Sequence, residues 1–219
     1  GAIDFDSAKP AWLRKTNFYM LMRNASLARL LTRFDAQSGT LTICQDSSEV
    51  ARADIATPSG RAHMEQFFAE FFGDEATDGA PRILEATDHM FGDASRKEGA
   101  DSDKYVSLVG LESIRALEQH TGGTVDPIRF RANLYVEGTA PWEEFSWVGK
   151  TISAGTAQLR VLAPITRCAA TQVNPTTAER DLNVPKALQQ GFDHIHMGVY
   201  AEVIRGGEVK LGDIVGPPS

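Results

Sequence analysis

Beyond residue 105 the sequence breaks into short runs of β-forming residues separated by glycines, and this pattern limits the fold more than any other feature. The runs are Tyr105–Val109, Ala132–Val136, Thr151–Ala154, Gln158–Ala163 and Val199–Arg205. Only two helices are expected beside them, at Leu111–His120 and after Asn183, which can cap a short helix with Pro185 in its first turn. Many short strands with few helices predict a mostly β, β-rich α+β fold, either a barrel or a sandwich. Periodicity alone does not choose between the two.

The chain is expected to end in a β-hairpin. The run Val199–Arg205 is followed by Gly206 and Gly207 and then by Glu208–Leu211. Two consecutive glycines tolerate the positive φ angles of a tight hairpin turn. The sequence therefore predicts that residues 208–211 fold back onto residues 199–205.

The first 104 residues form a separate portion that mixes helix and strand signals. Thr57-Pro58 is typical of a helix start. Five apolar residues follow at helical spacing: Met64, Phe67, Phe68, Phe71 and Phe72. Such a stripe could serve a cofactor, but docking of the helix on a core is the better interpretation. We divide the chain into an N-terminal β/helix portion, residues 1–104, and a core domain, residues 105–219.

Charge and cysteine content argue against several classes of protein. The formal net charge is −7, from 29 acidic and 22 basic side chains, whereas nonspecific nucleic-acid binding needs a basic surface. No apolar run approaches the ~20 residues of a membrane-spanning helix, so no membrane association is expected. Two cysteines, Cys44 and Cys168, are too few for a disulfide framework and indicate a reducing compartment, most simply the cytoplasm. Cys44 lies on the strand-like run 40–44 and is expected to be structural.

Cys168 is the residue with the strongest chemical potential. It stands in a polar segment, Arg167-Cys168-Ala169-Ala170-Thr171-Gln172-Val173-Asn174-Pro175. Nearby positive charge favours the thiolate, which is the form that attacks substrates or binds metals. The alternative is a small buried hydrophobe with no chemical task, which is the commoner fate of a free cysteine. The residues alone leave both interpretations open.

Six short motifs in a fixed order bear on that choice. They are Arg129-Phe130-Arg131-x-Asn133, Trp147-Val148-Gly149, Arg167-Cys168, Asn174-Pro175-x-Thr177, Tyr200-Ala201-x-Val203 and Gly212-Asp213. In this order the chain resembles the MOSC domain family, named for the C-terminal part of molybdenum-cofactor sulfurases. The resemblance runs from about Tyr105 to Val215 and is weaker from Trp12 to Ala86. It implies a β-barrel with peripheral short helices.

The resemblance also implies a set of site residues for the molybdenum cofactor, molybdopterin. Cys168 matches the cysteine that ligates molybdenum in the amidoxime-reducing members, and a soft thiolate suits a thiophilic metal. Arg131 and Asn133 match the Arg-x-Asn of the binding motif, and on an extended chain both would face one way. Arg23 resembles an arginine of the longer members, and Ser107 is a possible phosphate contact. For Arg131 the structural alternative is a salt bridge, and for Ser107 an incidental position on a strand.

Other polar residues near Cys168 are expected to support the site. Thr171 and Asn174 are assigned to cofactor binding or to holding the turn after the cysteine through side-chain to backbone hydrogen bonds. Arg167 is expected to be structural rather than a partner of the thiolate. Arg180 and Asp181 are expected to pair with each other or to order the loop.

His194 and His196 are too few for a zinc site. We expect these two histidines to be surface or rim residues, with proton transfer near a substrate as the alternative.

Three functions follow from the resemblance. The first is a molybdenum-dependent oxidoreductase that reduces a small N-hydroxylated or N-oxide compound. Two cysteines cannot hold an iron–sulfur cluster, and no flavin or haem motif is present. A separate redox partner would therefore supply the electrons. The second is a sulfur carrier in which Cys168 receives a persulfide from a cysteine desulfurase. The third is a cofactor-binding protein without turnover. Pyridoxal phosphate binding is implied only as a property of the family as a whole.

One departure from the family concerns the start of the sequence. Family members usually begin with a strand and a Gly-Asp-Arg segment, and this sequence starts after that point. We expect the barrel to lack that first strand. Because an unpaired sheet edge tends to recruit another chain, a homodimer through this edge is expected.

Overall fold

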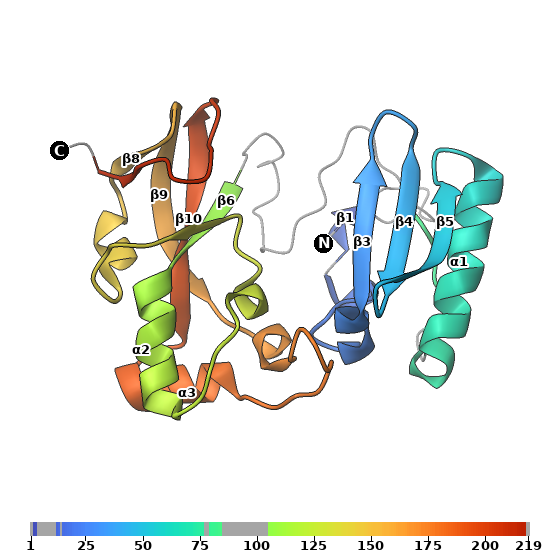
Figure 1. Cartoon of the computed structure of the whole chain (residues 1–219), viewed down its shortest axis with the longest axis horizontal. Coiled ribbons are helices and arrows are strands. Elements are labelled where there is room, and N and C mark those ends of the chain that lie inside the picture. Colours follow the sequence, from blue (N-terminus) through green and yellow to red (C-terminus); the bar gives the residue numbers. More distant parts are fainter. Residues whose placement is uncertain (1, 4–11, 14, 77–78, 85–104, 218–219) are drawn as a thin grey trace. The chain divides into compact units, whose positions relative to one another are not determined.

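The structure, a computed structural model, describes residues 2–3, 12–13, 15–76, 79–84 and 105–217. It divides into two compact units, Gly1–Asp101 with Thr176–Glu179 and Ser102–Pro175 with Arg180–Ser219 (Figure 1). The division predicted at residue 104 falls at the end of residues 85–104, which lie outside the described residues.

The described residues of the first unit form two small antiparallel sheets and one α-helix. Its elements are β1 (Ala2–Ile3), β2 (Trp12–Leu13), β3 (Leu30–Asp35), β4 (Thr40–Gln45), β5 (Ser48–Asp54) and α1 (Pro58–Phe72), with 3₁₀ helices at Lys15–Asn17, Ala25–Arg29 and Gly73–Glu75. β1 pairs with β2, and the second sheet has the order β3-β4-β5. The buried core is formed by Ile43, Ala51 and Met64, with Phe67 and Phe68 packed against it. Core packing of the α1 stripe is thereby confirmed.

Local sequence fixes both ends of α1. The Thr57 side chain accepts a hydrogen bond from the Gly60 backbone N–H at 3.0 Å, and Pro58 follows in the first turn. Gly73 ends the helix with a φ of 47°, a conformation that favours glycine. Gly60 lets the helix approach β5, because a Cβ there would lie 1.8 Å from the Asp54 carbonyl oxygen.

The second unit is built on one six-stranded sheet. Its elements are β6 (Tyr105–Gly110), α2 (Leu111–Thr121), β7 (Leu134–Val136), β8 (Thr151–Ala154), β9 (Ala157–Thr166), α3 (Val184–Phe192), β10 (His196–Arg205) and β11 (Val215–Gly216), with 3₁₀ helices at Pro127–Phe130, Glu143–Trp147 and Ala169–Gln172. The strand order is β11-β8-β9-β10-β6-β7. All neighbours are antiparallel except β6 and β7, which are parallel.

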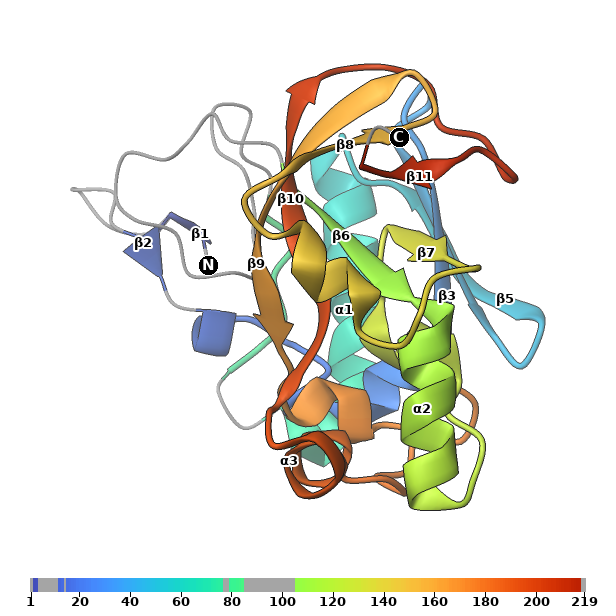
Figure 2. The same ribbon diagram turned by 90° about the vertical axis from the view of Figure 1, so that its left-hand side faces the viewer.

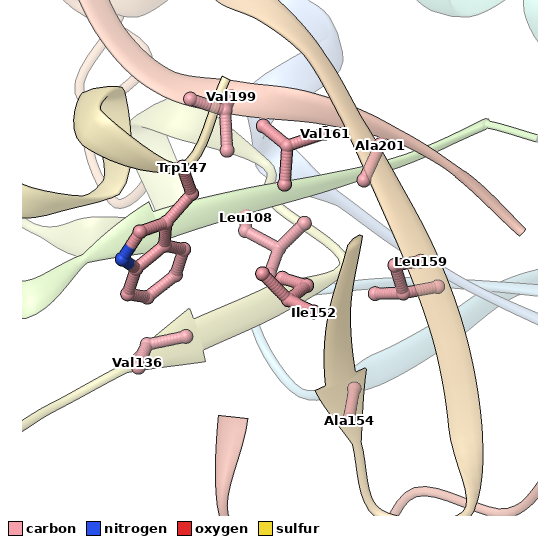
Figure 3. Close-up of a cluster of buried hydrophobic side chains, with 9 residues drawn as sticks. All are labelled: Leu108, Val136, Trp147, Ile152, Ala154, Leu159, Val161, Val199 and Ala201. Atoms are coloured by element: carbon pink, nitrogen blue, oxygen red, sulfur yellow. The ribbon is translucent and has the colours of Figure 1, made fainter. Parts of the chain in front are cut away.

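This sheet curls into a nearly closed barrel. One buried cluster collects side chains from strands near both ends of the strand order (Figure 3). Val136 comes from β7 at one end, Ile152 and Ala154 come from β8 near the other, and Leu108 and Val199 come from between them. An open flat sheet could not bring its two ends into one core. The predicted mostly β, barrel-type fold is confirmed.

A second core lies at one end of the sheet, where α2 and α3 pack together (Figure 2). Ile114, Leu117 and Leu188 from the two helices pack with Val109 and Met197 from β6 and β10. The N-terminus of α2 is capped by a side chain from a distant segment. The buried Glu144 carboxylate accepts hydrogen bonds from Ser113 Oγ at 2.9 Å and from Gly110 N at 3.3 Å, and a negative charge is favourable at a helix N-terminus.

The predicted C-terminal hairpin is wrong. Residues 208–211 do not pair with β10; the backbone N–H of Thr156 donates to the Glu208 carbonyl at 3.0 Å, and the Glu208 N–H donates to Thr156 Oγ1 at 2.8 Å. Gly207 permits this route, since a Cβ there would lie 2.4 Å from the Ala157 nitrogen. The chain therefore crosses the β8–β9 turn and reaches β8 as β11.

Candidate functional site

Cys168 lies just beyond the end of β9, at the first residue of a tight turn. Its backbone is extended, with φ −121° and ψ 179°, and it precedes the 3₁₀ helix Ala169–Gln172. The Cys168 carbonyl accepts hydrogen bonds from Thr171 Oγ1 at 2.8 Å and from the Thr171 N–H at 3.1 Å. Thr171 is buried and Cys168 is half-buried. The two hydrogen bonds from Thr171 therefore hold the backbone of Cys168 in place, while the cysteine remains partly accessible to solvent.

Arg167 anchors the chain on the other side of the cysteine. Its Nε donates to the Met197 carbonyl on β10 at 2.8 Å, and its Nη1 donates to the Phe130 carbonyl at 3.1 Å. Burial lowers the pKa of Arg167 to about 10, while Tyr200, Tyr135 and Cys168 act to raise it. The guanidinium therefore stays protonated at neutral pH and holds the end of β9 against two other segments.

Arg129 and Asp181 form an ion pair that clamps the turn after Cys168. Arg129 is only 4% exposed, and its Nη2 donates to both Asp181 carboxylate oxygens, at 2.7 and 2.9 Å. Its Nη1 donates to the carbonyls of Thr171 at 3.4 Å and Gln172 at 3.1 Å. Asn174 Nδ2 donates to the same carboxylate at 2.6 Å. Three separate segments are thus joined around the cysteine turn.

The protonation of Asp181 matters to this clamp. Burial acts to raise the pKa of Asp181, but the hydrogen bonds from Asn174 and Arg129 outweigh it, and the pKa lies below its usual value of 3.8. The carboxylate is therefore charged at neutral pH. Next to it, Arg180 Nη1 donates to the Ala169 carbonyl at 2.9 Å. Arg180 and Asp181 both order the loop, which is the second of the two expected arrangements.

The structure corrects the expected geometry of Arg131 and Asn133. They do not alternate on an extended chain, because Asp126 caps a 3₁₀ helix over Pro127–Phe130 through a 2.8 Å bond to the Ile128 N–H. Arg131 ends this helix in the left-handed region, with φ 47° and ψ 43°. Its side chain is exposed, yet partial desolvation lowers its pKa while nearby Tyr135 raises it.

Asn133 is paired with Ser107 by reciprocal hydrogen bonds. Asn133 Oδ1 accepts from the Ser107 N–H and from Ser107 Oγ, both at 2.9 Å, and the Asn133 N–H donates to the Ser107 carbonyl at 3.1 Å. On the next strand Tyr200 is directly opposite Ser107, and directly opposed residues share a face of the sheet. Two predicted cofactor contacts therefore lie together on one side of the barrel wall.

The predicted contacts form two groups, one around Cys168 with Thr171 and Asn174, the other of Ser107, Arg131 and Asn133. Arg23 belongs to neither group. Arg131 follows Phe130, whose carbonyl receives Arg167, so the segment 129–133 adjoins the cysteine segment. Arg23 belongs to the first unit, where its Nη1 donates to the Thr16 carbonyl at 3.1 Å. Its role at a cofactor remains a prediction.

The two histidines lie in an aromatic cluster. The ring of His194 meets Trp142 and Phe145 edge-on, with centroids 5.0 and 5.4 Å apart, and stacks with His196 at 5.9 Å. His194 Nδ1 accepts a hydrogen bond from the His196 N–H at 3.2 Å. Burial lowers the pKa of His194, and the charge of His196 lowers it further. Within the described part of the chain, no three His, Cys, Asp or Glu side chains are grouped to hold a metal ion.

The sequence profile of the MOSC domain matches residues 86–216, more than half of the chain. The chain belongs to the MOSC domain family. Molybdenum cofactor sulfurase from Drosophila ananassae is 36% identical over 98 residues, which cover 42% of this chain and 12% of that protein. The Bos taurus protein of the same name is 22% identical over 206 residues, covering 83% of this chain and 22% of that protein. The MOSC chain thus spans less than a quarter of the length of either relative.

Among solved structures, YiiM from Geobacillus stearothermophilus aligns with 52% of this MOSC chain and 54% of its own, with a TM-score of 0.41 and 21% identity. In the parts of the chain that the structure describes, none of the helices is long and apolar enough to cross a membrane.

The ion pair of Arg129 with Asp181 was missed in the sequence, where Asp181 was expected only to pair with Arg180 or to order the loop. Asp181 and Arg129 are 52 positions apart, and no local pattern links them. The available signal was the spacing of the two arginines in Arg129-Phe130-Arg131. Two arginines so close together can serve different purposes, one in the structure and one in ligand binding. The structure buries the first and exposes the second.

Proposed function

We propose that this MOSC protein binds the molybdenum cofactor with Cys168 as the protein ligand of the metal, and that it reduces a small N-hydroxylated or N-oxide compound. The observation that carries the proposal is the junction of two motif segments of the family. Arg129 donates to the carbonyls of the turn after Cys168, and Arg167 donates to the carbonyl just before Arg131. The thiol and the Arg-x-Asn motif therefore belong to one hydrogen-bonded framework.

The donor set of this framework fits such a cofactor. A half-buried thiol on a fixed turn offers a soft ligand for a thiophilic metal. The exposed Arg131 fork suits a phosphate or a pterin carbonyl oxygen. Asn133 uses its Oδ1 toward Ser107, so its Nδ2 is the group that can donate to a bound molecule. Arg23 remains a further candidate from the family resemblance.

In this proposal the chain positions groups and the cofactor supplies the redox chemistry, namely oxygen-atom acceptance coupled to two-electron transfer. Overall, the N-hydroxylated compound takes up two electrons and two protons and yields the reduced nitrogen compound and water. A separate donor protein supplies the electrons. The clamp of Arg129 and Asp181 keeps the Cys168 turn in one conformation, and Arg131 with Asn133 orients the group bound beside it.

A second candidate is a persulfide carrier, and the names of the relatives favour it. The two relatives described above are molybdenum cofactor sulfurases. In this role the Cys168 thiolate attacks the outer sulfur of a cysteine desulfurase persulfide, an S–S bond forms at Cys168, and the desulfurase thiolate leaves. The same half-buried cysteine would then pass its outer sulfur to a metal or cofactor.

Metal analysis separates these functions. The protein is produced in a host that makes the cofactor, and its molybdenum and pterin contents are measured beside those of Cys168→Ser, with Cys44→Ser as the matched control because Cys44 lies on β4 of the other unit. Cofactor lost only with Cys168 supports the proposal, and reduction of N-hydroxylated compounds with an artificial electron donor then separates an enzyme from a binding protein without turnover.

The persulfide candidate has its own assay. After incubation with a cysteine desulfurase and cysteine, sulfane sulfur on Cys168 without bound molybdenum would favour the carrier role and refute the first proposal. Cytoplasmic location and family-level binding of pyridoxal phosphate remain predictions.

A further inference from the structure

Arg131 adopts a backbone conformation that is unfavourable for residues with a Cβ atom. Its φ is 47° and its ψ is 43°, which places it in the left-handed region. In this region the Cβ atom crowds the following carbonyl oxygen, so glycine adopts it most readily. Strain of this kind persists only where the surrounding structure holds the residue, and it clusters at functional sites. Neighbouring groups must therefore hold Arg131 in place.

The hydroxyl of Tyr135 bridges the two ends of the segment that contains Arg131. It donates a hydrogen bond to the Pro127 carbonyl at 2.7 Å and accepts one from the Ala132 N–H at 3.1 Å. Burial raises the pKa of Tyr135, so the hydroxyl retains the proton that it donates. A single side chain thus joins the residue after Arg131 to the start of the 3₁₀ helix before it.

The position of Tyr135 is set by the barrel and its core. Tyr135 lies on β7, where Val109 of β6 is its partner in the parallel ladder. Its side chain packs against the second core, to which the buried Val109 and Phe130 belong. The hydroxyl is therefore presented by a packed strand, and the Arg131 segment is fastened to it by hydrogen bonds.

The residue before Arg131 is held as well. The Phe130 carbonyl accepts a hydrogen bond from Arg167 Nη1 at 3.1 Å, and the Arg131 N–H donates to the Ile128 carbonyl at 3.1 Å. The Arg131 side chain is exposed, and its guanidinium makes no hydrogen bond within the part of the chain that the structure describes. A charged fork thus stands between two fixed neighbours with its donors turned to solvent.

We propose that Tyr135 is a positioning residue, which keeps Arg131 in its left-handed conformation so that the guanidinium can bind an anionic or carbonyl oxygen of a ligand. This inference rests on the proposed function, in which the ligand is molybdopterin and the oxygen belongs to its phosphate or its pterin. A planar fork binds such oxygens in a narrow range of orientations. Fixing the fork before binding reduces the entropy that is lost when the ligand binds.

Binding of molybdopterin tests this role. The full chain is produced in a host that cannot make the cofactor and is titrated with molybdopterin in the absence of oxygen, with pterin fluorescence as the signal. Tyr135→Phe should raise the dissociation constant roughly three- to tenfold. In an Arg131→Ala background the same substitution should change nothing further, because Tyr135 acts only through Arg131. A further loss of affinity in that background would overturn the proposal.

Tyr19→Phe is the matched control, because it also removes a tyrosine hydroxyl that donates to a carbonyl. The Tyr19 hydroxyl bonds to the Gly79 carbonyl at 2.8 Å in the first unit, and its loss should leave the dissociation constant unchanged. A wild-type chain that binds no molybdopterin would refute the proposed function and this role of Tyr135 together. Normal binding by wild type that Tyr135→Phe leaves unaltered would refute the positioning role alone.

Two measurements without ligand test whether Arg131 is strained and held. Arg131→Gly and Arg131→Ala both remove the guanidinium, but only glycine relieves the left-handed strain. Arg131→Gly should therefore melt ~2–4 °C above Arg131→Ala. In hydrogen exchange, the Ala132 N–H should exchange faster in Tyr135→Phe than in wild type, because it loses its acceptor. A glycine variant that melts no higher than the alanine variant, or equal exchange at Ala132, would overturn the proposal.

Discussion

Replacement of Asp181 by asparagine should destabilise the turn that carries Cys168. The carboxylate accepts two hydrogen bonds from the 4%-exposed Arg129 and one from Asn174. Asparagine keeps nearly the same shape but removes the charge, so the buried guanidinium loses its anion. Beside its bonds to the carbonyls of Thr171 and Gln172, Arg129 could keep at most one uncharged bond to the asparagine Oδ1, and the asparagine NH2 would face the guanidinium as a second donor.

The structure sets the size of this effect. Breaking a buried ion pair by removing one partner costs ~3–5 kcal/mol. The Asp181 side chain is 37% exposed, so water already solvates it in part, and we expect a smaller loss of about 2 kcal/mol in the free energy of unfolding. In a chain of this size each kcal/mol lowers the melting temperature by ~2–4 °C, which gives a decrease of about 4–8 °C.

Thermal and urea unfolding at pH 7 measure this loss. Glu208→Gln is the matched control, because Glu208 pairs with Lys210 and both side chains are about 70% exposed, and a surface pair contributes only ~0–1 kcal/mol. Hydrogen exchange adds a local readout. The Thr171 N–H, which donates to the Cys168 carbonyl, should exchange faster in Asp181→Asn than in wild type. The amides of β8 should exchange at the same rate in both proteins.

The pH dependence provides the decisive check. Because the folded pKa of Asp181 lies below its usual value of 3.8, its stabilisation is fully present well above that value and is lost as pH falls through the folded pKa. The difference between wild type and Asp181→Asn should therefore be constant from neutral pH to about pH 5 and shrink in more acidic solution. Equal stability of both proteins at pH 7, or a difference that persists unchanged in strong acid, would refute the role of the ion pair.

Three further predictions concern the thiol, the cofactor fork and the aromatic cluster. Cys168→Ser should lose molybdenum retention while the fold stays intact, because a hydroxyl is a harder ligand that rarely ionises; full metal content in this variant would exclude the thiol as ligand. Arg131→Ala should weaken cofactor binding roughly ten- to hundredfold, and Arg131→Lys less, because lysine keeps the charge; equal pterin occupancy in all three proteins would contradict this. The pKa of His194 is lowered in the folded protein, so the free energy of unfolding should fall as pH drops below ~6.5. Urea unfolding between pH 7 and 5 should show that this free energy depends less on pH in His194→Phe than in wild type. An equal pH dependence in both proteins would point to another group.

The strands could be predicted because they are specified locally, whereas the choice of a barrel over a sandwich came from the resemblance to the MOSC family. Thr151–Ala154 has the bounds expected from the sequence, and Asn183 caps α3 through a 3.1 Å bond to the Lys186 N–H. The hairpin after Val199 failed for a non-local reason. Gly206 and Gly207 satisfy a tight turn equally well whether the chain folds back on β10 or approaches another turn, and hydrogen bonds with Thr156 decide the outcome.

The error at Arg131 had a visible cause in the sequence. Asp126-Pro127 carries the same cap-then-proline signal that was recognised at Thr57-Pro58, and it starts a 3₁₀ helix that runs into the motif. A short helix ending at Phe130 leaves Arg131 at its end rather than on a strand, and β7 begins only at Leu134. The strand predicted at Ala132–Val136 therefore begins two residues later, at Leu134, and the Arg131–Asn133 segment is not part of it.

The two arginines of this motif should now be separable by experiment. Sequence similarity draws attention to Arg131, which is exposed and whose guanidinium makes no hydrogen bond among the described residues, so its loss should change ligand binding and leave stability nearly unaltered. Arg129 is buried and bonded to three residues of the cysteine loop, so Arg129→Met should lower stability even without any ligand. If Arg129 acts only by holding the turn, Arg129→Met and Asp181→Asn should be non-additive, because both remove the same ion pair. Additive losses would mean that each residue stabilises the fold independently and that the Cys168 turn does not depend on their contact.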